Sequence, residues 1–230
     1  MKKRLNIQYS LAIVAALLFS TPILAQPKIP DITGVKEIHI DLACNATLIQ
    51  GEKASVSITG DEDALEDVYA KLKGDVLVIG NDKHHQHKND VKVTITIPDL
   101  RKLCIGGAVD ITTPNQVKFD NIELEVSGVA DLDIKLLSKM LNLEASGVIS
   151  GEIVGETKDL KMEISGVGKI DASGFKAENC EIEVSGVAKA DVYATEKLDA
   201  SVSGMGNIHY LGRPVINRSS SGFGSISRLE

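Results

Sequence analysis

Six Ser-Gly dipeptides in the second half of this 230-residue chain follow one another at regular intervals of 18 to 20 residues. The surrounding sequence is alike each time, as in SGVA at Ser127 and SGVG at Ser165. The glycines of the six dipeptides are Gly128, Gly147, Gly166, Gly186, Gly204 and Gly222. A fixed period near twenty residues is typical of a solenoid, in which successive turns of the chain stack on one another. The repeat therefore constrains the shape of the molecule far more than its chemistry.

Within each repeat, apolar and polar residues alternate. The apolar or small positions of the first full repeat are Ile122, Leu124, Val126, Gly128, Ala130, Leu132 and Ile134. Period two predicts a strand with one buried and one solvated face. We therefore predict an all-β fold, a right-handed single-stranded β-helix (a pectin-lyase-like solenoid) with about 19 residues per coil. A propeller fits less well because each blade needs about 40 residues, and a sandwich gives no reason for one dipeptide at one spacing.

The chain divides into three parts. Residues 1–25 combine an early cluster of positive charge with an apolar run and a small-residue cleavage point at Ala25, which predicts a signal peptide. Residues 26–100 form a β-rich part that we expect to join the solenoid, with one short helix over Asp61–Leu72 where apolar residues follow helical spacing. Residues 101–230 form the repeat β-helix.

Charge and hydropathy exclude several classes of protein. The first 25 residues carry three positive and no negative charges, so their removal takes the formal net charge from −7 to −10. An acidic chain is a poor nucleic-acid binder, because neutralising phosphates requires clusters of Lys and Arg. After signal cleavage no apolar stretch is long enough to cross a bilayer as a helix. We expect an exported protein of the periplasm or the cell surface.

The three cysteines differ in their place in the alternation. Cys44 and Cys180 share the register of their apolar neighbours, so both are predicted to be core thiols, whereas Cys104 has the opposite register to Leu103 and Ile105. An odd number of cysteines rules out a fully paired framework. We expect no structural disulfide.

Several segments resemble the GIN-domain family, the head domain of autotransporter adhesins, once classed as a domain of unknown function. They are the opening GVKEIHIDLACNATLIQGEKASVSITGDEDALEDV, the VTITIPDLRKL segment, the serial SGVG units and the closing SGMGNIHYLGRPVI. The resemblance covers roughly residues 32–227. It implies a fold similar to pectin-lyase-type β-helices, export in Gram-negative bacteria and adhesin-like attachment. It supplies no catalytic residues.

One residue after each repeated glycine there is a larger apolar side chain. These residues are Val129, Val148, Val167, Val187, Met205 and Phe223. If alternation continues through the turn, they form an outward stripe and mark a possible interface. If instead the Ser-Gly step is a bulge with glycine at positive φ, the register shifts and the side chains are buried. Both interpretations remain open at the level of sequence.

Two acidic columns are expected on the outside of the β-helix. They consist of Glu125, Glu144, Glu163 and Glu183, and of Asp133, Glu152, Asp171 and Asp191. Stacked carboxylates repel unless they are solvated or neutralised, here by Lys161, Lys169 and Lys189 or by calcium. A solvated acidic face is the favoured interpretation. The polar loop with His84, His85 and His87 is interpreted as a solvated tip, so no metal and no cofactor are predicted.

Enzymatic motifs are not found in the sequence. Asp131 and Asp133 lie on one predicted strand face and invite comparison with glycosidase carboxylates. The chain nevertheless has no Trp and few aromatic side chains for a sugar platform. We predict a non-enzymatic adhesin-like or structural binding module of the bacterial cell envelope, with an envelope protein or glycan as partner, or a homo-oligomer. The alternative is a β-helix carbohydrate-active enzyme or glycan-binding protein.

Overall fold

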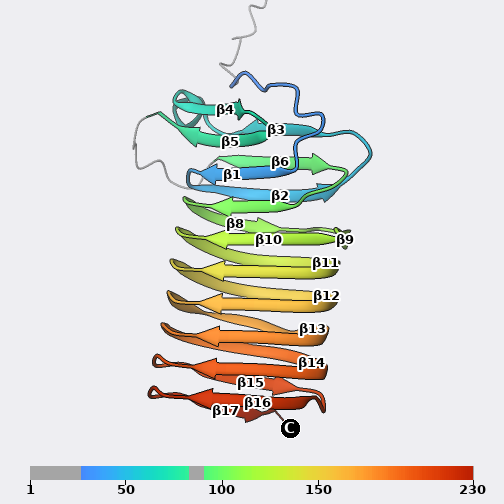
Figure 1. Ribbon diagram of the computed structural model, residues 1–230. Helices are drawn as coiled ribbons and strands as arrows, with labels where there is room; N and C mark the ends of the chain where they lie inside the picture. The colour runs from blue at the N-terminus through green and yellow to red at the C-terminus, as the bar shows by residue number, and fades with distance from the viewer. Residues whose placement is uncertain (1–26, 83–90, 230) are drawn as a thin grey trace, which may run out of the picture.

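The computed structural model describes residues 27–82 and 91–229, and these form a β-solenoid whose coils stack along one axis (Figure 1). Seventeen strands of the described ranges belong to one hydrogen-bonded system, and α1 (Glu62–Leu65) is their one helix. The predicted signal peptide lies outside the described residues.

Each coil contributes to two parallel ladders of strands. The first ladder contains β5 (Val76–Asn81), β1 (Glu37–Asp41), β7 (Lys102–Ile105), β10 (Asn121–Val126) and, at the far end, β16 (Val215–Ser220). The second ladder contains β6 (Lys92–Ile97), β2 (Cys44–Gln50), β8 (Ala108–Thr112), β15 (Asn207–Leu211) and β17 (Ser225–Arg228).

Four long strands connect the ladders in the middle of the stack. They are β11 (Val129–Ala145), β12 (Val148–Ile164), β13 (Val167–Val184) and β14 (Val187–Val202). Each begins in the second ladder and ends in the first, so the chain passes one edge of the solenoid without leaving the strand. The short β9 (Val117–Lys118) pairs with the middle of β11 at that edge.

The core follows the alternation seen in the sequence. Leu124, Leu143, Met162 and Ile182 are register partners in four successive coils, and each is at most 3 % exposed. Apolar side chains stacked in this way remove a continuous column from water, and such burial is the main favourable contribution to folding. Cys44 and Cys180 lie in this core, as their register predicts, and Cys104 points outward.

At the N-terminal end, the order of strands in space differs from their order in sequence. β1 lies between β5 and β7, and β2 lies between β6 and β8. The coil made by the earliest strands is therefore the second coil of the stack. β3 (Ser55–Thr59) and β4 (Val68–Lys73) pair antiparallel with β6 and β5 and cover the end of the solenoid, as the upper part of Figure 1 shows.

The helix predicted over Asp61–Leu72 is wrong beyond its first turn. α1 ends at Leu65, and the chain from Val68 onward is strand β4. Val68 and Ala70 are buried, and the whole of β4 pairs with β5. The cause is tertiary: pairing with β5 outweighs the weak local preference that the helical spacing expresses.

Candidate binding surface

The two ladders meet in a sharp corner at each of the six regularly spaced Ser-Gly dipeptides, along the left edge of Figure 1. The backbone N–H groups of Ser146 and Gly147 both donate to the carbonyl oxygen of Val126 in the preceding coil, at 2.9 and 3.2 Å. The next N–H group, of Val148, donates to the carbonyl oxygen of Gly128 at 2.9 Å. The same pattern recurs at the corners that begin with Ser127, Ser165, Ser185 and Ser203. The corner thus preserves the inter-coil hydrogen bonds while the chain reverses.

The six repeated glycines stack directly on one another along the axis. A Cβ atom added to Gly166 would overlap the carbonyl oxygen of Gly147, and one added to Gly186 would overlap that of Gly166. The glycines with positive φ are elsewhere in the described chain, at Gly34, Gly74, Gly151, Gly155 and Gly212. Glycine is therefore required at these corners by close backbone contact, and the interpretation as a positive-φ bulge is wrong.

The apolar residues that follow these glycines point outward. Their exposed fractions range from 46 % for Val148 to 92 % for Phe223. Val129, Val148, Val167 and Val187 are register partners in adjacent strands, so their side chains stand side by side at the ~4.8 Å inter-strand spacing. We call this set of six residues the apolar stripe: Val129, Val148, Val167, Val187, Met205 and Phe223. The alternative of burial, left open by the sequence, is contradicted by these exposures.

An acidic groove runs beside the apolar stripe. Its volume is about 300 Å³, and the outward side chains that line it include Cys104, Glu125, Glu144, Glu163 and Glu183, with the corner serines along one side. The four glutamates are register partners, as predicted. Because each Glu precedes its corner glycine by three residues and each stripe residue follows it by one, the serines separate groove from stripe.

Lysines neutralise part of the acidic groove. Lys102 Nζ lies 2.9 Å from Glu125 Oε1, and Lys161 Nζ lies 2.7 Å from Glu163 Oε1. The hydrogen bond from Lys102, followed by that from Cys104, lowers the pKa of the Glu125 carboxyl. The hydrogen bond to Glu163 raises the pKa of Lys161. The groove remains acidic because its column of four glutamates meets only these two lysines within ion-pair distance in the described chain.

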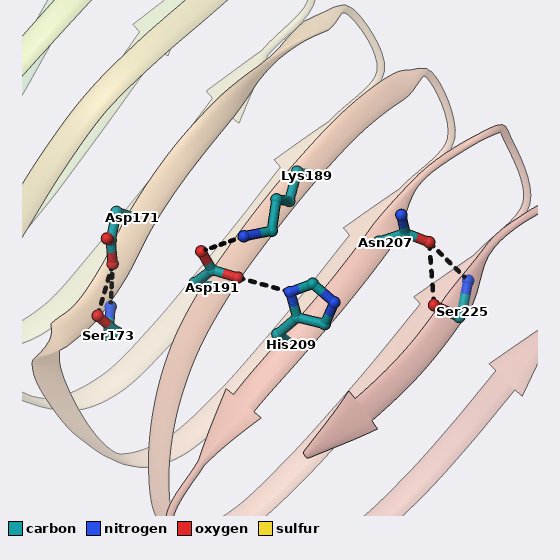
Figure 2. A network of polar contacts seen from close by, with 7 residues as sticks. All are labelled: Asp171, Ser173, Lys189, Asp191, Asn207, His209 and Ser225. Atoms are coloured by element: carbon teal, nitrogen blue, oxygen red, sulfur yellow. Dashed lines mark hydrogen bonds and ion pairs between the residues drawn. The ribbon is translucent and has the colours of Figure 1, made fainter. Parts of the chain in front are cut away.

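The second acidic column lies on the other ladder and ends in a polar network (Figure 2). Asp191 is 6 % exposed. Its carboxylate oxygens lie 2.9 Å from Lys189 Nζ and 2.8 Å from His209 Nδ1. His209 is the register partner of Asp191 in the next coil. Asp171 accepts hydrogen bonds from the hydroxyl and backbone N–H of Ser173, at 2.6 and 3.0 Å, and these lower its pKa. Asp171 and Asp191 of this column are thus already bound by neighbouring polar groups of the protein.

A third cluster joins residues that lie far apart in the sequence. His39 on β1 and Cys104 on β7 are register partners, and His39 Nε2 lies 2.8 Å from Glu37 Oε1. Cys104 Sγ donates to Glu125 Oε2 at 3.1 Å. Burial, followed by this hydrogen bond, raises the pKa of the Cys104 thiol to about 12. Sequence reasoning did not bring His39 and Cys104 together, although the outward register of both residues was a usable signal.

The remaining candidate residues do not form a site of their own. Asp131 and Asp133 are exposed on β11, and Asp131 Oδ2 accepts a hydrogen bond from Ser150 at 2.5 Å. A hollow of about 730 Å³ lies elsewhere, lined by Asp99, Arg101 and Asp120 among others, with no aromatic side chain in its lining. His84, His85 and His87 lie outside the described residues. Within the described ranges, the structure contains no helix with the length and hydropathy needed to cross a bilayer.

Known proteins share this architecture. A solved structure from Bacteroides fragilis, described as a "putative adhesin", is 30 % identical, with a TM-score of 0.80 over 85 % of this chain and 94 % of that chain. Two structures from Parabacteroides distasonis, described as a "putative lipid binding protein" and a "putative adhesin", are each 20 % identical with TM-scores of 0.67. They cover 88 % and 85 % of this chain and 94 % and 92 % of their own. At this identity they show the fold alone.

No curated protein matches the sequence. The family model described as "Putative auto-transporter adhesin, head GIN domain" matches residues 35–214, which include both ladders except β16 and β17, and five of the six repeated glycines. The resemblance read from the sequence is confirmed, and the chain belongs to the GIN-domain family of adhesin head domains.

Proposed function

We propose that this protein is an exported, non-enzymatic adhesin-like binding module of the bacterial cell envelope, and that its Ser-Gly edge is the contact surface. The observation that carries the proposal is the apolar stripe, six exposed apolar side chains in successive coils. Monomeric proteins rarely expose continuous apolar patches without a use for them. The adhesin description of the family, and the signal-like sequence of residues 1–25, support attachment outside the cytoplasm.

The stripe is suited to a protein partner. Apolar burial stabilises a contact by about 25 cal/mol per Å². A few hundred Å² therefore contributes several kcal/mol before the cost of association is subtracted. The acidic groove beside the stripe adds charge selectivity, because opposite charges accelerate encounter and disfavour wrong partners. The chemistry favours an envelope protein whose apolar ridge is flanked by Lys or Arg.

Three observations disfavour an enzyme. Asp131 and Asp133 are both exposed, the acidic groove holds no aromatic platform, and the lining of the 730 Å³ hollow contains none. Glycosidase carboxylates act in a site that positions the sugar between them. Turnover of an acidic polysaccharide that is lost in Asp131→Ala or Asp133→Ala would contradict the non-enzymatic proposal.

The decisive experiment compares the parent with a stripe variant and a matched control. The stripe variant carries Val148→Asp, Val167→Asp and Val187→Asp, which place charges on exposed positions of 46–52 %. The control is Met140→Asp, an apolar residue of similar exposure, 45 %, that lies outside the stripe. Binding of each labelled protein to isolated envelopes, and sedimentation of each alone, are measured.

We expect the stripe variant to bind envelopes at least tenfold more weakly while the control binds like the parent. If instead the parent self-associates and the stripe variant does not, the stripe joins two copies of this chain. Equal binding of all three proteins to envelopes would contradict a stripe-mediated protein contact. So would binding to a glycan array that is the same for the parent and the stripe variant. Melting curves verify that the variants remain folded.

A further inference from the structure

We propose that Glu37, His39 and Cys104 form a binding site for a zinc-class divalent ion at the junction of the second and third coils, with Glu125 as the fourth ligand. The potential ligand atoms of Glu37, His39 and Cys104 all lie within 4.8 Å of one another. An imidazole nitrogen, a thiolate and carboxylates are the ligands that zinc takes in proteins. The site shares Cys104 and Glu125 with the acidic groove, but the argument for metal binding does not rest on the proposed envelope contact.

The fold brings these residues together through register. β1 pairs with β7 so that Glu37 lies opposite Lys102 and His39 lies opposite Cys104. β10 pairs with β7 on its other side and places Glu125 opposite Cys104. Because outward positions alternate along each strand, the four side chains project from one face of three neighbouring strands. A rigid ladder, rather than a loop, holds the backbone of every ligand.

The distances are close to those that a tetrahedral ion requires. Zinc binds sulfur at about 2.3 Å and nitrogen or oxygen at about 2.0–2.2 Å, which separates ligand atoms by about 3.3–3.8 Å. His39 Nε2 and Glu37 Oε1 are 2.8 Å apart, and Cys104 Sγ and Glu125 Oε2 are 3.1 Å apart. Both pairs must open slightly, and a pair at the 4.8 Å limit of the Glu37, His39 and Cys104 group must close by about 1 Å. Side-chain rotations accomplish this, because all four residues are only partly buried.

The local charge also favours a cation. Glu37 and Glu125 within the cluster and Glu123 beside it are acidic, and the described cation within ion-pair distance, Lys102, already contacts both Glu123 and Glu125 at 2.9 Å. An ion that replaces the His39–Glu37 and Cys104–Glu125 hydrogen bonds offsets the remaining negative charge. Calcium fits poorly because it prefers six to eight oxygen ligands.

The position gives the ion a structural consequence. Cys104 stands at the N-terminal end of the acidic groove, and His39 belongs to the coil made by the earliest strands. An ion bound here ties that coil to the one formed some 65 residues later in the sequence. Because a ligand that binds only the folded state stabilises it by mass action, the melting temperature should rise with zinc concentration.

The test uses the purified protein, kept reduced, with Co²⁺ as a spectroscopic substitute and Zn²⁺ as competitor. We expect one equivalent of Co²⁺ to give thiolate charge-transfer absorption and the intense visible bands of a tetrahedral site, both abolished by Zn²⁺. Cys104→Ser should remove the charge-transfer band, and His39→Gln and Glu37→Gln should each weaken binding at least tenfold. Zinc should also slow the alkylation of Cys104 at least tenfold in the protein without substitutions, and this measurement needs no variant.

Two controls separate this site from other histidines. His209→Gln alters the other outward histidine–carboxylate pair of the described chain, which has no thiol beside it, and should leave binding unchanged. A variant with His84, His85 and His87 replaced by Gln should keep the charge-transfer band. Binding that survives Cys104→Ser, or that disappears only with the loop histidines, would overturn the proposal. So would zinc that neither raises the melting temperature nor protects Cys104.

Discussion

The backbone of Gly166 packs against the carbonyl oxygen of Gly147 so closely that no Cβ atom fits between the two coils. We expect Gly166→Val to destabilise the protein by about 3 kcal/mol, because the added side chain would overlap the backbone of the preceding coil and force the two coils apart. Chemical unfolding measures the change. Ser165→Ala, at the adjacent exposed residue, should stay within about 0.5 kcal/mol of the parent. A parent-like Gly166→Val would contradict the close contact.

Inward and outward residues of the same corner should respond differently to truncation. Ile164 is 1 % exposed and Val167 is 52 % exposed. Ile164→Ala should cost about 2–5 kcal/mol, because it removes buried methyl groups and leaves a cavity. Val167→Ala should change stability by no more than about 0.5 kcal/mol. Comparable losses for the two variants would mean that the stripe belongs to the core.

The three cysteine thiols should differ in how fast they are alkylated, because they differ in accessibility. Cys44 and Cys180 are each 2 % exposed, and burial raises the pKa of each thiol to about 12. The pKa of Cys104 is raised to the same value, so access of the reagent and not the thiolate fraction distinguishes the three thiols. A small alkylating reagent should therefore modify Cys104 slowly and alone in the native protein, and all three cysteines in denaturant. Mass spectrometry after timed quenching provides the count. Rapid native labelling of Cys180 would show that the core opens.

The hydrogen bonds from Ser173 to Asp171 should make the free energy of unfolding depend on pH in the acidic range. They lower the pKa of Asp171, so their contribution is present above the unfolded pKa of about 3.9 and is lost as pH falls through the folded value. Ser173→Ala should raise the pKa of Asp171 in a carboxyl-detected NMR titration. Its cost near neutral pH should be below about 1 kcal/mol because the site is partly solvated, and should vanish at low pH. Ser138→Ala, whose hydroxyl contacts Thr157, serves as the control.

Two aspartates of the same column should differ in their importance. Asp191 is buried and contacts Lys189 and His209, whereas Asp133, in the same register column, is exposed. Asp191→Ala should cost about 1–3 kcal/mol, because it leaves the partners without their acceptor. Asp133→Ala should remain within about 0.5 kcal/mol. Thermal melting of both variants tests the difference, and equal losses would contradict it.

The repeat made much of the solenoid predictable. Ser-Gly spacing places Glu125 beside Glu144 and Val148 beside Val167 once each period is taken as one coil. Alternation within a strand then separates core residues such as Met162 from outward residues such as Glu163. Both inferences depend only on local periodicity, which the sequence displays directly.

The N-terminal part was less predictable because long-range pairing decides it. The apolar spacing of Leu65, Val68 and Leu72 suits a helix, yet β5 captures the second half of that segment as a strand. Likewise, no local pattern places His39 beside Cys104, because β2 to β6 lie between them in the sequence. Whether the apolar stripe points outward or inward depends on the backbone conformation of the repeated corner glycine. The periodicity of the sequence does not reveal that conformation.

The position of the β1–β2 coil between two coils that are synthesised later has a consequence for how the chain folds. A growing chain cannot add its coils one by one from the first strand, because β5 and β6 must return and cover an edge that β7 and β8 approach from the other side. Each return closes a long loop before contacts compensate for the lost chain entropy. Deleting β1 and β2 would therefore do more than shorten the solenoid by one coil. It would remove the coil that joins strands β3 to β6, at the N-terminal end of the stack, to the coils that begin with β7 and β8.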